Sequence, residues 1–187
     1  MLNSLVGIIA SSGGAAGGAA YESIASATGT GSSGTITFSA IPSTYTSLQI
    51  RGVARTTTAG VAQGQIRVTA NGDSSALYAY HQLEKTVATN GVNTTYVEVS
   101  PTGIPFAGHQ ANYLGSVILD IHNYASTSQN KTFRMFSGLI IPSDVASVTI
   151  SSGLYRSTSA LSSITLTASS GSWTTTTQFA LYGIKGA

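Results

Sequence analysis

Asp120 and His122 are the residues whose types and spacing come closest to a metal site. They are two positions apart, and residues i and i+2 of a strand project from the same face. A carboxylate and an imidazole are both common zinc ligands. Two ligands are too few for a site. The apolar residues Val117, Leu119 and Ile121 instead predict that this pair lies on the solvent or interface face of a strand. We therefore expect no metal there.

The remaining ionisable residues do not predict an active site. The chain has no Cys, which excludes thiolate metal sites, disulfides and Cys nucleophiles. No two acidic residues are spaced as an obvious acid/base pair, and neither G-x-S-x-G nor H-E-x-x-H occurs. We expect no enzymatic activity and no cofactor. The least favoured alternative is an enzyme such as a depolymerase, because folding would have to bring two scattered carboxylates together in one groove.

Residues 29–34 read Gly-Thr-Gly-Ser-Ser-Gly, which matches the glycine pattern of dinucleotide-binding loops. Such a loop opens a helix whose N-terminus holds the pyrophosphate. Here residues 35–38 follow, and they alternate like a strand. Residues 49–53 stand where the ribose-binding acid belongs, and they contain no acid. We interpret residues 29–34 as a turn.

The composition predicts an all-β protein. The 187 residues include 28 Ser, 25 Thr and 21 Gly, and only 7% of them are charged. Thr favours strands, whereas Gly weakens helices. A hydrophobic fraction of 42% with a net charge of +2 argues against disorder. The length is that of one domain, or of one domain with an arm.

Short alternating segments at regular spacing predict a jelly-roll-type β-sandwich of about ten strands over residues 21–187. The expected strands are residues 35–38, 46–55, 65–70, 76–83, 94–99, 116–122, 132–139, 146–151, 161–168 and 177–184. No apolar run is long enough for a transmembrane helix, so we expect no membrane partner.

Residues 1–20 form a different region, rich in Gly and Ala and too small in side-chain volume for a core. We predict an extended docking arm whose apolar residues bind a partner surface: Leu5, Val6, Ile8 and Ile9. The alternative is that the arm packs on its own domain as an extra edge strand. The start has no basic region, so we expect no secretory signal.

Two arginines are candidate partner-binding residues. Arg51 and Arg55 are expected on outward strand faces, with Arg67 nearby, where they could receive carboxylates or phosphates. The alternative is ordinary solvated ion pairing. Lysines number only three, so no dense basic stripe predicts nucleic-acid binding. The low charge favours association of copies.

Tyrosines are plentiful, and they include Tyr78, Tyr80, Tyr96 and Tyr113. Tyrosine clusters can stack on sugars, but buried tyrosines are common in β-sandwiches. We expect these four to pack in the core or in an interface rather than to form a ligand platform.

Five segments together resemble small virion structural proteins of tailed bacteriophages, common in aquatic phages including those of cyanobacteria. They are residues 5–9, 38–51, 69–73, 119–125 and 179–185. The resemblance implies a capsid cement or decoration protein with a jelly-roll body on the exterior of the phage head. Its partners would be the major capsid protein and itself, as a homotrimer. The alternative is a tail or fibre component that binds host surface glycan. The resemblance carries no catalytic residue, and it leads us to expect an apolar residue where His122 stands.

Overall fold

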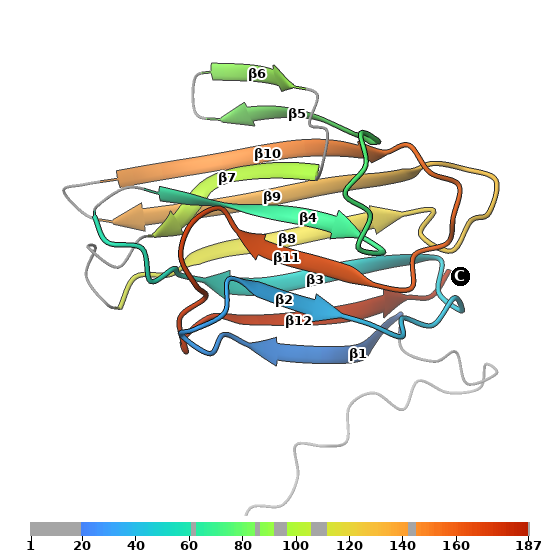
Figure 1. Cartoon of the computed structure of the whole chain (residues 1–187), viewed down its shortest axis with the longest axis horizontal. Coiled ribbons are helices and arrows are strands. Elements are labelled where there is room, and N and C mark those ends of the chain that lie inside the picture. The colour runs from blue at the N-terminus through green and yellow to red at the C-terminus, as the bar shows by residue number, and fades with distance from the viewer. Residues whose placement is uncertain are drawn as a thin grey trace, which may run out of the picture.

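The computed structural model describes residues 20–60, 63–84, 87–91, 97–105, 112–141 and 145–186. These residues form twelve strands in two antiparallel sheets and no helix, and the smaller sheet lies across one face of the larger (Figure 1). The all-β sandwich is thereby confirmed, whereas the jelly-roll connectivity stays a prediction.

The larger sheet has eight strands. Their order across the sheet is β1 (Tyr21–Thr28), β12 (Gln178–Ile184), β3 (Ser47–Ala54), β8 (Gly115–His122), β9 (Lys131–Ile141), β10 (Val145–Tyr155), β5 (Tyr78–Glu84) and β6 (Val87–Gly91). The smaller sheet has four, in the order β2 (Thr35–Phe38), β11 (Ile164–Ala168), β4 (Gln63–Ala70) and β7 (Val97–Pro105).

The core lies between the two sheets and follows from the alternation of side chains along the strands. In β8, Val117, Leu119 and Ile121 are at most 3% exposed, and they face the smaller sheet. Ile164 and Leu166 on β11 are buried from the other side. This packing fixes the register of β8 and β11, because a slip of one residue would turn their buried apolar residues outward.

Close packing also explains a glycine on β3. Gly52 is paired with Phe179 of β12. A Cβ at Gly52 would collide with the Phe179 ring and with the backbone oxygen of Gln178. Only a residue without a side chain lets the two strands pair while the ring of Phe179 fills the core.

Most of the predicted strands are present, with boundaries that differ by a few residues. Residues 29–34 form the turn before β2, as predicted, and no helix follows them. Two strands were not predicted, β1 and β6. β1 has Ile24 as its single large aliphatic residue, and β6 lacks an alternating pattern, so neither gives a clear period-2 signal. Residues 1–19 of the predicted arm lie outside the described residues.

Candidate interaction surface

Large apolar side chains cover part of the outer face of the large sheet, which is the face turned away from the smaller sheet. They are between 39% and 72% exposed, and we call them the outer apolar patch: Leu83, Ile118, Phe136, Ile140, Val148 and Ile150. Strand register makes four of them continuous. Ile118 is paired with Phe136, Phe136 with Ile150, and Ile150 with Leu83, so the row crosses β8, β9, β10 and β5 without a break.

On β10 the inner side is polar and the outer side is apolar, which is the reverse of β8. On β10, Ser147, Thr149 and Ser151 are at most 4% exposed, while Val148 and Ile150 between them are at least half exposed. A sandwich standing alone in water is expected to show the opposite pattern. Contiguous exposed apolar surface of this kind is typical of interaction sites.

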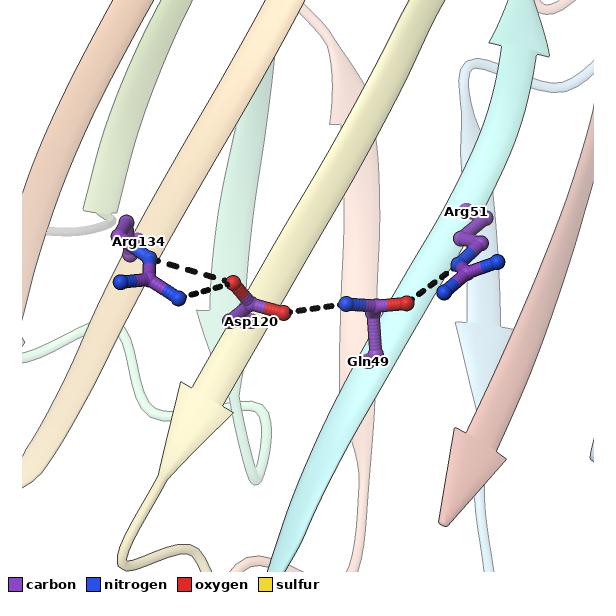
Figure 2. Close-up of polar contacts among 4 residues, drawn as sticks. All are labelled: Gln49, Arg51, Asp120 and Arg134. Atoms are coloured by element: carbon purple, nitrogen blue, oxygen red, sulfur yellow. Dashed lines mark hydrogen bonds and ion pairs between the residues drawn. The ribbon is translucent and has the colours of Figure 1, made fainter. Parts of the chain in front are cut away.

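A polar row lies next to the patch on the same face, and its four side chains form one chain of contacts (Figure 2). Arg134 Nη2 donates to Asp120 Oδ2 at 2.8 Å, and Gln49 Nε2 donates to Asp120 Oδ1 at 2.6 Å. Arg51 Nε donates to Gln49 Oε1. The contacts run from β9 through β8 to β3, so adjacent strands set the orientation of each member.

Asp120 has the lowered pKa that this network implies. Burial raises the pKa of Asp120, but the hydrogen bonds from Gln49 and Arg134 and the charge of Arg134 outweigh it. The carboxylate is therefore ionised at neutral pH, and both of its oxygens are engaged. It orients Gln49 and is not available as a general acid.

Arg51 is exposed, and its guanidinium contacts two aromatic rings. Its guanidinium carbon lies 5.0 Å from the ring centroid of Tyr21 and 5.8 Å from that of Tyr182. Such cation–π contacts fix the position of the charge without neutralising it. Beside Arg51 the sheet is hollowed by a volume of about 670 Å³, which reaches from β1 to Phe136 on β9.

Some of the predicted site residues lie where the sequence places them, and others lie outside the described residues. Asp120 and His122 share the outer face as expected. Among the described residues, no three of His, Asp and Glu come together as metal ligands, and the expectation of no metal stays a prediction. Arg51 lies on the outward face, as predicted. Leu5, Val6, Ile8 and Ile9 lie outside the described residues, so their role stays a prediction.

The expected outward position of Arg55 is wrong. Arg55 is 5% exposed, and its Nη1 donates to the backbone oxygen of Tyr113 at 3.2 Å. The strand ends at Ala54, so alternation no longer decides where the next side chain points. Burial lowers the pKa of Arg55. A guanidinium enclosed in this way is not presented to a partner.

The prediction that the tyrosines pack in the core is confirmed for Tyr78. Tyr78 is fully buried and stacks on Tyr155 with ring centroids 4.8 Å apart. Burial raises the pKa of Tyr78 to about 12. Tyr96 lies outside the described residues. The tyrosines that flank Arg51 were not among the candidates, and only the pairing of β1 with β12 and of β12 with β3 brings them to it.

No helix in the described ranges is long and apolar enough to cross a membrane. Comparison of the chain with models of protein families, with curated proteins and with solved structures found no match. We therefore argue function from the outer face of the large sheet.

Proposed function

We propose that this chain is a structural protein of a bacteriophage virion, and that it binds other protein subunits through the outer apolar patch. One observation carries the proposal: β10 turns Val148 and Ile150 to the outside and Ser147 and Thr149 to the inside. Such a strand is well placed only when another protein covers its outer face. The resemblance of residues 38–51 and 179–185 to virion structural proteins is the reason for proposing a virion as the location of this chain.

The action would be adhesive. The jelly-roll body would form a homotrimer and bridge neighbouring subunits of the major capsid protein, while residues 1–20 would lie along the shell. Each contact buries apolar surface, at about 25 cal/mol per Å². Many copies acting together would then strengthen the shell through avidity.

Copy number is the first test of this proposal. Quantitative mass spectrometry of purified virions should find the chain in numbers comparable to the major capsid protein. A handful of copies per particle would contradict a cement role and would point to the tail. Sedimentation of the purified chain should show a trimer, and a monomer both in solution and on the particle would refute that oligomeric state.

The role of the arm is tested by deletion of residues 1–20. The shortened chain should keep the circular dichroism of a β-protein, because the strands that form the core begin after it. It should no longer bind capsids. Undiminished capsid binding would show that the arm is not needed for binding, and the outer apolar patch would then be the remaining proposed binding surface.

A second candidate is a tail or fibre component that binds host glycan. Tyr182 and Arg51 line the hollow, and Tyr21, which is 45% exposed, also contacts Arg51. Aromatic rings next to polar side chains suit the stacking of a sugar. Binding of host polysaccharide that is lost in Tyr182→Ala but kept in Phe136→Lys would favour this candidate over the first.

A further inference from the structure

We propose that Arg51 and the hollow beside it receive an acidic side chain from a different protein, whose apolar neighbouring residues cover the outer apolar patch. The proposal rests on the proposed function, because it names the chemistry of the partner that the patch binds. It is carried by the free donors of Arg51, by the residues that line the hollow, and by the contacts of the three acidic residues whose side chains are described.

Arg51 keeps the end of its guanidinium available. Its Nε donates to Gln49, whose amide is turned by Asp120 so that the oxygen faces Arg51. Within the described residues, Nη1 and Nη2 have no hydrogen-bond partner and no carboxylate lies within ion-pair distance. Two parallel N–H donors on a fixed plane match the two oxygens of a carboxylate.

The hollow accepts a carboxylate together with an apolar group. Small side chains on three strands, Ser26, Ser116 and Ala180, leave the space open. Ile118 and Phe136 line its far end, and both belong to the outer apolar patch. A ligand that fills the hollow therefore continues directly onto the apolar row. A protein segment with an acidic residue among apolar ones could fill the hollow and cover the apolar row at the same time. A sugar in the hollow would leave the apolar row exposed.

Among the described side chains, a second copy of this chain offers no unengaged acid to Arg51. Three of its carboxylates have described side chains, and each is already engaged. Glu22 pairs with Lys185 Nζ at 2.7 Å, and Asp120 is held by Arg134 and Gln49. Asp73 accepts hydrogen bonds from Ser75 and Tyr155. Within the described residues, charge complementarity thus favours a different protein at Arg51.

The test uses two blocked tripeptides, acetyl-Leu-Glu-Leu-amide and its Gln counterpart, titrated into the full chain and followed by NMR. The Glu peptide should bind at least about tenfold more tightly than the Gln peptide, because the pair at Arg51 is charge-assisted. It should shift the Arg51 Nε–H signal and the Ile118 methyl signals. Arg51→Gln should abolish the preference for Glu. Arg156→Gln should keep it, because Arg156 is an exposed arginine whose hydrogen bonds within the described residues go to backbone oxygens.

The outcomes separate this inference from the proposed function. Equal affinity for the two peptides, with both lost in Phe136→Lys, would overturn the acidic anchor and leave the patch in place. Affinities that Phe136→Lys does not change would overturn the patch, and no binding of either peptide would overturn the patch and the anchor together. If glucuronate binds at Arg51 more tightly than the Glu peptide, the ligand of the hollow is a sugar acid and the proposal of an acidic protein segment is wrong.

Discussion

Phe133 and Phe136 lie three residues apart on β9 and face opposite sides of the large sheet. Phe133 is fully buried between the sheets, whereas half of Phe136 is exposed beside Ile118 and Ile150. The same residue type therefore meets two different environments on one strand. The inner ring contributes to the folding of the single chain, and the outer ring lies on the face through which we propose that a partner binds.

The largest effect should come from truncating these two rings separately. Phe133→Ala should lower the free energy of unfolding by about 3–5 kcal/mol, because it leaves a cavity in the core. Phe136→Ala should change the stability of the isolated chain by no more than about 0.5 kcal/mol, yet reduce binding to the partner. Urea unfolding of both variants measures the contrast. A large loss in Phe136→Ala would show that the outer face belongs to the core.

Two glycines extend the comparison. Gly52→Ala should destabilise the chain by about 1–3 kcal/mol, because its Cβ would collide with Phe179 and Gln178. Gly138 on β9 is paired with Ser116 and Val148, which face outward, and a Cβ there meets only Ser147 O at 3.6 Å. Gly138→Ala should therefore stabilise by at most about 1 kcal/mol. Thermal unfolding that ranks the two variants in the reverse order would contradict the assigned faces.

The sequence predicts the strands well but not the faces of all of them. In β8, Val117, Leu119 and Ile121 alternate with polar residues except at Ile118, and the buried face is clear. In β10 the sequence Ser-Val-Thr-Ile-Ser also alternates, which predicts Val148 and Ile150 inside, and the structure shows them outside. Ser and Thr are small enough to be enclosed, so pattern alone does not decide.

The hollow beside Arg51 depends on relations that no local pattern carries. It requires the register of β1, β12, β3, β8 and β9 at once, and four pairings set that register. A single strand predicts only that Arg51 faces away from Ile50 and Gly52. The residues opposite Arg51 come from positions as distant as Ser26 and Ala180, so their closeness appears only in the folded chain.

A buried serine on the inner side of β9 offers a smaller test. Ser137 is 1% exposed, and its Oγ has no hydrogen-bond partner in the part of the chain that the structure describes. Ser137→Ala should raise the free energy of unfolding by about 1 kcal/mol, because an unsatisfied hydroxyl is removed. Ser152→Ala, on the exposed face of β10, should leave it unchanged. A destabilised Ser137→Ala would mean that this hydroxyl is satisfied within the fold.

The smallest effect concerns acid. Since hydrogen bonds hold the pKa of Asp120 below its ordinary value, the unfolded chain binds this proton first as pH falls. The stability from Asp120 is therefore complete above about pH 4 and is lost as pH drops through the folded pKa. At pH 6 the free energy of unfolding of the wild type should exceed that of Asp120→Asn by less than about 1 kcal/mol. This difference in stability should vanish in acid. A difference that grows toward low pH would have the wrong sign.

The most direct test of a covered outer face is thiol labelling, because the chain has no cysteine of its own. Ile150→Cys places a single thiol in the patch, and Thr37→Cys places one on the exposed face of the smaller sheet. Maleimide should label both at similar rates in the isolated chain. In the native assembly, labelling at position 150 should slow at least about tenfold relative to position 37, as expected for a buried interface. Equal labelling of the two positions in the assembly would contradict the account.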